Sequence, residues 1–445
     1  MKRFIETLKN IWKIEELREK ILLTLGLLLV YRLGSNVVLP GINPESLSNL
    51  QAQADGGILG LLDAFTGGAF SNASILALGI MPYISASIVI QLLGMAVPSI
   101  QKMQKEGESG RRKINQITRF LTIAITAAQA PGYIANLMSQ QVELTMAPGL
   151  FWITAIIVLT AGTVFAMWLG ERITDKGIGN GISLLIMVGI IASLPQALIQ
   201  EFASKYDLGG GMVLFILEIA ALLIVILLSV ALVQAVRRVP VQYAKRTTGG
   251  RTFSGNAARQ YIPLKVNAAG VMPIIFAQAI MFIPVTVLSY ANLEGDNASA
   301  VVSAFSNIQG FWYNTVFAVM IILFTYFYTA IQVNTNQMAE DLKRNGGFIP
   351  GIKPGKTTAD FLDTVLSRIT LPGSIFLALL AILPAFAMIA GVNTQFSYFY
   401  GGTSLLIMVG VVLDTLQQIE SYLLNRHYDG LMKSGKLKGR AVSSI

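Results

Sequence analysis

The sequence SLLIMVG occurs at residues 183–189 and again, unchanged, at residues 404–410. A second pair of stretches also matches, with GIMPYI at 79–84 and GVMPII at 270–275. Two matched pairs in the same order along one chain indicate an internal repeat. Because all four stretches are apolar, the segments around them decide what kind of structure is repeated.

Each repeated stretch lies within a longer apolar segment of the length that crosses a membrane. The chain is 53% hydrophobic and 13% charged, against about 25% charged in a typical soluble protein. A bilayer core of about 30 Å is crossed by roughly 20 apolar residues in a helix, which satisfies its own backbone polar groups. We therefore predict an all-α, polytopic membrane protein with ten spans, at 21–39, 73–97, 117–138, 150–170, 181–199, 212–236, 268–290, 311–335, 371–391 and 398–420.

The repeat predicts that the ten spans form two inverted halves. One pair of stretches lies in spans five and ten, and the other in spans two and seven. Because five spans separate the copies, each copy crosses the membrane in the direction opposite to its partner. We predict two five-helix halves, 21–199 and 200–420, around a central pore.

An inverted repeat places the functional site between its halves, near the middle of the membrane. Ile84 aligns with Ile275, and Ile186 aligns with Ile407. Charged residues near the middle of a span would indicate an ion-coupled transporter, and the repeated stretches contain none. What is duplicated is therefore an apolar element.

The basic residues predict the orientation. All 33 Lys and Arg except Arg32 and Lys205 lie in segments that share one side of the membrane: 1–20, 98–119, 171–180, 237–266, 336–370 and 421–445. The positive-inside rule puts these segments, and both termini, in the cytoplasm. Apolar residues at helical spacing predict an amphipathic surface helix within 1–20, and 421–445 is a basic tail. Arg32 is expected to extend toward the outer surface.

Composition excludes several chemistries. The chain has no cysteine and a single histidine, His427, so thiolate sites, histidine metal sites and a histidine triad are not expected. It also lacks a phosphate-binding P-loop motif. We predict no catalytic residue, no cofactor and no metal. The net charge of +9 follows from the cytosolic loops, which favours anionic lipids as partners and predicts no direct nucleic-acid recognition.

Residues 56–72, GGILGLLDAFTGGAFSN, are apolar but too short to span the bilayer. They follow the first span on the external side, where such a segment is either a re-entrant element or an interfacial helix. Asp63 within it requires contact with water, as in a water-filled vestibule.

Seven stretches, in order from span two to span ten, resemble the signatures of the SecY family: GGAFSNASILALGIMPYISASIVIQLL (67–93), KEGESGRRKINQ (105–116), MWLGERITDKGIGNGIS (167–183), YAKR (243–246), PLKVNAAGVMP (263–273), FIPGIKPG (348–355) and FYGGTSLLI (399–407). The resemblance implies a protein-conducting channel subunit of the bacterial plasma (inner) membrane. It also implies halves hinged between spans five and six, and a lateral gate between spans two and three and spans seven and eight.

The resemblance further implies three sets of site residues. A ring that closes the pore would consist of Ile80, Ile84, Ile182, Ile186, Ile275 and Ile407. An external plug helix would include Ile58, Leu59, Leu61, Leu62, Asp63, Phe65 and Phe70. Cytosolic docking residues on the loops at 237–266 and 336–370 would include Arg251, Arg368, Lys245, Arg246 and Lys353. Many relatives carry two adjacent arginines where this chain has Gly250 and Arg251, which weakens the assignment of Arg251.

The partners that the resemblance implies are the subunits SecE and SecG, the motor ATPase SecA or the ribosome, and a translocating polypeptide with its signal sequence. Two other classes of function remain open from the sequence. An inverted-repeat secondary transporter would show coupled solute flux without any ATPase partner. A scaffold or insertase without transport would tolerate polar residues at Ile84 and Ile275.

Overall fold

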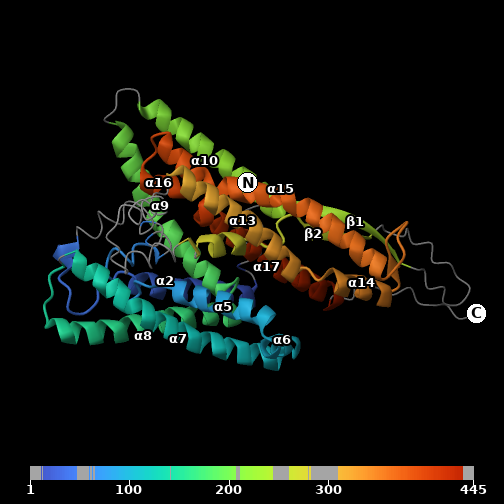
Figure 1. Cartoon of the computed structure of the whole chain (residues 1–445), viewed down its shortest axis with the longest axis horizontal. Coiled ribbons are helices and arrows are strands. Elements are labelled where there is room, and N and C mark those ends of the chain that lie inside the picture. The colour runs from blue at the N-terminus through green and yellow to red at the C-terminus, as the bar shows by residue number, and fades with distance from the viewer. Residues whose placement is uncertain are drawn as a thin grey trace, which may run out of the picture. The chain divides into compact units, whose positions relative to one another are not determined.

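The computed structural model of the chain describes residues 12, 14–47, 60, 63, 66–140, 142–206, 211–243, 260–278, 280–281 and 309–433. These residues fold into two compact units (Figure 1). The first unit contains Met1–Pro195 and Val411–Ile445, and the second contains Gln196–Gly410. The chain therefore passes from the first unit to the second within one helix, α9 (Gly181–Tyr206), and returns within another, α17 (Gly402–Lys433).

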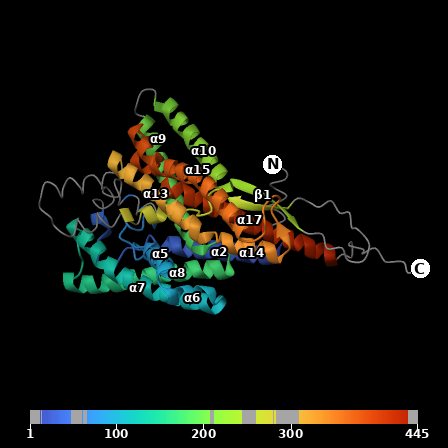
Figure 2. The ribbon, with the colours of Figure 1, turned by 45° about the vertical axis from the view of Figure 1, so that its right-hand side comes forward.

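The first unit is helical in its described part. Besides the beginning of α9 and the end of α17, it contains α2 (Glu15–Gly34), the 3-10 helix η1 (Pro44–Leu47), α5 (Met81–Ala96), α6 (Pro98–Lys105), α7 (Glu108–Ser139) and α8 (Pro148–Lys176). Helices α7 and α8 run side by side in both views (Figures 1 and 2). A glycine allows one close approach in this unit, because a side chain at Gly162 of α8 would collide with the carbonyl oxygen of Ile75.

The second unit combines helices with a small sheet. Its elements are α10 (Gly211–Gln234), β1 (Val236–Tyr243), β2 (Gln260–Lys265), α13 (Phe311–Gln332), α14 (Thr335–Arg344), β3 (Gly347–Phe348), α15 (Lys356–Ile389), α16 (Thr394–Ser397) and the 3-10 helix η2 (Tyr398–Tyr400). Helix α13 lies along α15 (Figures 1 and 2).

The prediction of a polytopic helical membrane protein is confirmed. Among the described residues, six helices are long and apolar enough to cross a bilayer: α8, α9, α10, α13 with its continuation into α14, α15 and α17. The pair α5 and α6, bent by 104°, would make a seventh. Helices α2 and α7 occupy the first and third predicted spans but begin in charged segments. The seventh predicted span, 268–290, is helical at 272–278 and 280–281, and its remainder lies outside the described residues.

Two predicted spans differ from the helices observed. The second span was predicted from residue 73, but α5 begins at Met81 because 67–80 runs as a series of turns. Gly79 has φ +52°, a left-handed conformation that interrupts a right-handed helix. The ninth span was predicted from residue 371, but α15 begins at Lys356 and extends well beyond the bilayer length.

The repeated stretches have the same local structure in each unit. Gly79 and Gly270, which align in the repeat, both have positive φ, +52° and +64°. The next helix begins two residues later in each case, at Met81 and at Met272. Helices α9 and α17 likewise both begin two residues before their SLLIMVG stretches. The sequence repeat is therefore a repeat of backbone structure.

The described residues of the cytosolic loops predicted at 237–266 and 336–370 form a folded module. Strands β1 and β2 pair antiparallel, from Val236 with Lys265 to Val241 with Gln260, and β3 pairs with the end of β1. The sheet packs on α14 and the first turns of α15 around an apolar core made of Val239, Val241, Leu264, Leu342, Ile349, Leu362 and Leu366. We call this part of the second unit the sheet module.

Candidate functional site

Four of the six isoleucines of the predicted pore ring lie at corresponding places in the two units, Ile84 with Ile275 and Ile186 with Ile407. Ile80 precedes α5, and Ile84 lies one helical turn later, with its backbone N–H donating to the Ile80 carbonyl oxygen (3.1 Å). Ile182 and Ile186 occupy the first turns of α9. In the second unit, Ile275 follows Met272 and Ile407 lies in the first turns of α17.

These isoleucines differ in how exposed their side chains are. Ile80, Ile186 and Ile407 are buried, whereas Ile84, Ile182 and Ile275 are only partly covered. A partly covered apolar side chain remains available for a further contact. A substitution there also removes less packing than one at a buried position.

The predicted plug is described only at its C-terminal end. Asp63 and Phe70 are described, while Ile58, Leu59, Leu61, Leu62 and Phe65 lie outside the described residues. The Asp63 carboxylate accepts a hydrogen bond from the backbone N–H of Ser71 (2.8 Å), and its carbonyl accepts one from Gly68 (3.1 Å). The Asp63 side chain thus closes the turn that follows it.

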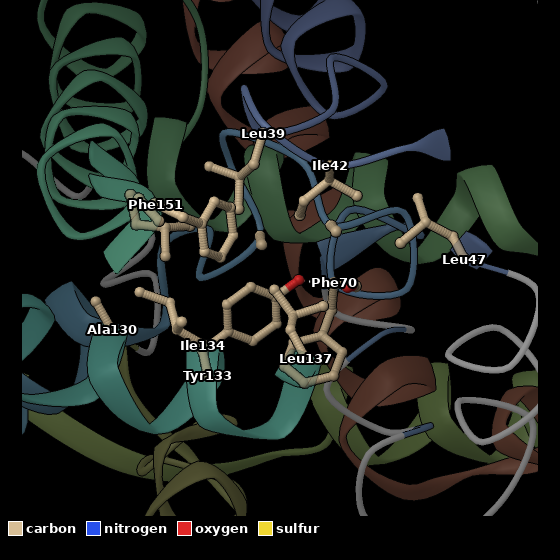
Figure 3. Close-up of a cluster of buried hydrophobic side chains, with 13 residues drawn as sticks. Leu39, Ile42, Leu47, Phe70, Ala130, Tyr133, Ile134, Leu137 and Phe151 are labelled. Carbon is tan, nitrogen blue, oxygen red and sulfur yellow. Dashed lines mark hydrogen bonds between the residues drawn. The ribbon is translucent and has the colours of Figure 1, made fainter. Parts of the chain in front are cut away.

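Phe70 fastens this segment to α7 (Figure 3). Its ring contacts the Tyr133 ring edge-on, with centroids 4.9 Å apart, and its carbonyl oxygen accepts a hydrogen bond from the Tyr133 hydroxyl (2.8 Å). Both residues belong to the buried apolar cluster of the first unit, which also includes Leu39, Ile42, Leu47, Ala73, Ala77, Ala130, Ile134, Leu137, Phe151, Ala155 and Leu159.

Gly67 lies between two helices of the first unit. Its φ of +65° is left-handed, and a Cβ there would come 2.7 Å from the Cα of Gly189 on α9. On the other side, Arg32 of α2 donates a hydrogen bond from Nη1 to the Gly67 carbonyl oxygen. Gly189 is the last residue of the first SLLIMVG stretch.

The predicted docking residues fall partly within the sheet module. Arg368 lies exposed on α15, two residues after Leu366 of the module's core. Lys353 is exposed in the turn before α15, where its carbonyl oxygen accepts a hydrogen bond from the Thr358 hydroxyl (2.9 Å). Arg251, Lys245 and Arg246 lie outside the described residues.

Sequence reasoning did not single out other exposed cations on this module. They are Arg237, Arg238, Lys265, Lys343, Arg344 and Lys356. The sequence offered one sign of a strand, the placement of Val239 and Val241 two residues apart, so that both face the same side. The described basic residues of 237–266 and 336–370 therefore lie exposed on a folded surface.

The second unit also contains a buried ionic cluster that the sequence did not reveal. Lys205 Nζ lies 3.0 Å from Glu218 Oε1 and 3.6 Å from Glu201 Oε1, and donates to the Gly391 carbonyl oxygen (2.9 Å). Glu201 Oε2 accepts a hydrogen bond from the Asn393 backbone N–H (2.8 Å). We call Glu201, Lys205 and Glu218 the ion triad. The Glu201–Lys205 spacing of four residues was its only local sign.

Comparison with known proteins identifies the family. The SecY family model matches residues 74–416. The chain belongs to the SecY family. A Streptomyces scabiei relative named protein translocase subunit SecY is 42% identical over 95% of this chain and 98% of its own length. A Bacillus licheniformis relative of the same name is 45% identical over 96% and 99%.

Solved structures support the same fold for this SecY family member. A structure described as that of a protein-conducting channel covers 96% of this chain and 94% of its own, with a TM-score of 0.59 and 17% identity. Sec61 in a canine ribosome–channel complex from the endoplasmic reticulum has a TM-score of 0.53 and 16% identity. At these identities the likeness concerns the fold alone.

Proposed function

We propose that the chain is the pore-forming subunit of a bacterial protein-conducting channel. It passes unfolded polypeptides across the plasma membrane and releases apolar segments sideways into the lipid. The near full-length similarity to relatives named protein translocase subunit SecY carries this proposal. The apolar character of the repeated stretches agrees with it, since a channel for arbitrary sequences needs no fixed hydrogen-bond partners.

In this proposal the six isoleucines converge into one ring. A narrow apolar ring excludes water and therefore resists ions when no polypeptide fills it. Residues 56–72 cover it from outside as a plug. A signal sequence leaves through a lateral gate because each Leu or Ile gains a few tenths of a kcal/mol, on the order of 0.3–0.6, in the membrane core.

The partners are part of the proposal. SecE and SecG complete the complex, and SecA or the ribosome docks on the cytosolic side, where both termini lie. The basic surface of the sheet module suits such a partner, and the basic segments also attract anionic lipid. Arg368 and Lys353 are exposed on this module.

Reconstitution tests the function directly. The chain is placed in liposomes with SecE, SecG and SecA, and a radiolabelled precursor is added outside with ATP. We expect ATP-dependent protection of the precursor from protease. Solute flux coupled to an ion gradient, without precursor protection or any need for SecA, would instead identify a secondary transporter.

Charge reversal at Arg368 should weaken docking. Arg368→Glu replaces an exposed cation with an anion, and arginines are frequent energetic centres of interfaces. We expect the affinity for SecA or for ribosomes to fall at least about tenfold, or about 1.4 kcal/mol, in a membrane-vesicle binding assay. Arg344→Glu, also exposed on the sheet module, is the matched control. Equal losses for both variants would mean that the module contributes only general charge.

A further inference from the structure

Arg32 is out of place by the rules that orient the rest of the chain. It lies in the last turn of α2 and, with Lys205, is one of two cations outside the segments assigned to the cytosol. A cation there opposes the positive-inside pattern, so a structural contact should explain it. Lys205 has such a contact in the ion triad. Arg32 forms no ion pair with any residue that the structure describes, so its role differs from that of Lys205.

The guanidinium of Arg32 is oriented toward a backbone carbonyl. Nη1 donates to the Gly67 oxygen and also to Ser35 Oγ (3.3 Å). The buried Ser35 hydroxyl in turn donates to the Arg32 carbonyl oxygen (2.7 Å), which leaves its lone pairs free to accept from Nη1. The side chain is thus held by its own helix while it holds Gly67.

Gly67 suits a point of attachment. Its left-handed φ favours glycine, and a side chain there would collide with the backbone of Gly189. Gly68, with φ +86°, follows directly. The next fixed point is Phe70, whose carbonyl accepts from Tyr133. Residues 66–70 are therefore hydrogen-bonded to α2 and α7 and packed closely against α9, all within the first unit.

We infer that Arg32 is a positioning residue that holds the C-terminal base of the plug in its closed place. The inference rests on the proposed channel function. A hydrogen bond from a charged guanidinium to a backbone carbonyl is stronger than one between neutral groups. It also does not depend on the identity of any plug side chain. Tyr133 supplies a second, neutral attachment. Loss of either contact should leave the plug less firmly seated while the ring and the helices remain.

The test measures the ion leak of the resting channel in liposomes. We expect Arg32→Gln to raise the ion leak about tenfold, equivalent to about 1.4 kcal/mol. Arg32→Lys should raise it less, because lysine keeps the positive charge but lacks the planar guanidinium with its several N–H donors. Tyr133→Phe, which keeps the ring contact with Phe70, should raise it by a smaller factor. Arg18→Gln, at a half-exposed site in the first turn of the same helix, is the matched control.

A double substitution separates positioning from general destabilisation. Gly67→Ala displaces the carbonyl that Arg32 holds, so Arg32→Gln combined with Gly67→Ala should leak no more than the leakier single variant. Additive leaks, or an Arg32→Gln leak equal to that of Arg18→Gln, would overturn the inference. If Arg32→Gln fails to accumulate, Arg32→Lys and Tyr133→Phe decide the question. If the wild-type channel translocates precursor but the Arg32 variants show no increased ion leak, only the role of Arg32 is refuted. If the wild-type channel translocates no precursor, the proposed function is refuted.

Discussion

Replacing Ile84 and Ile275 together with serine should open the resting channel to ions. Each isoleucine lost from an apolar constriction removes about 1.5 kcal/mol or more of the cost of wetting it. Two losses, about 3 kcal/mol, correspond to roughly a 100-fold rise in conductance. Both side chains are only partly buried, so the substitutions should spare the fold.

The measurement is ion conductance of purified channels in planar bilayers without precursor or motor. Val89→Ser with Ile280→Ser is the matched control, since both residues are exposed and follow Ile84 and Ile275 along the same helices. The ring variant should also export precursors with weakened signal sequences. Conductance and export equal to those of the control pair would refute the assignment of these residues to a ring.

The features that were predicted correctly from the sequence are those that short, repeated patterns encode. The identical SLLIMVG stretches begin helices α9 and α17 at equivalent residues, because a local apolar run sets a membrane helix. Hydropathy wrongly predicted that residues 73–80 belong to a membrane helix. Those residues are apolar, but Gly79 is left-handed and the segment runs as turns. Hydropathy measures partition into lipid and carries no information about backbone conformation.

Contacts between distant residues were the part that the sequence did not reveal. Strand β1 needs β2 and β3, which lie far along the chain, so its alternating valines were assigned to a loop. Arg32 was expected to extend toward the outer surface, yet it donates to Gly67. In the sequence, Lys205 is only an exception to the orientation rule. Its partners Glu218 and Gly391 become neighbours only in the folded chain.

Replacing Lys205 with methionine should be among the most destabilising single changes in the second unit. Glu201 is fully buried and Glu218 is 9% exposed. Removing the ammonium leaves their two carboxylates without a counter-ion, and breaking a buried ion pair in this way costs about 3–5 kcal/mol. The Gly391 carbonyl also loses its donor. Thermal unfolding of the purified protein in detergent measures the loss, and Lys343→Met, at an exposed site on α14, should change stability by less than about 0.5 kcal/mol.

We expect the loss of stability in Lys205→Met to come from unbalanced buried charge rather than from lost packing. Neutralising the carboxylates should therefore restore stability. Lys205→Met combined with Glu218→Gln should recover much of the stability, because one buried charge remains and Glu201 keeps the Asn393 N–H. Acidification should likewise recover part of the loss in Lys205→Met, since a protonated carboxyl costs less to bury than a carboxylate. If neither change restores stability, the methylene stem of Lys205 contributes through packing, and the ion triad is not what joins the ends of α9 and α10 to residues 391–393.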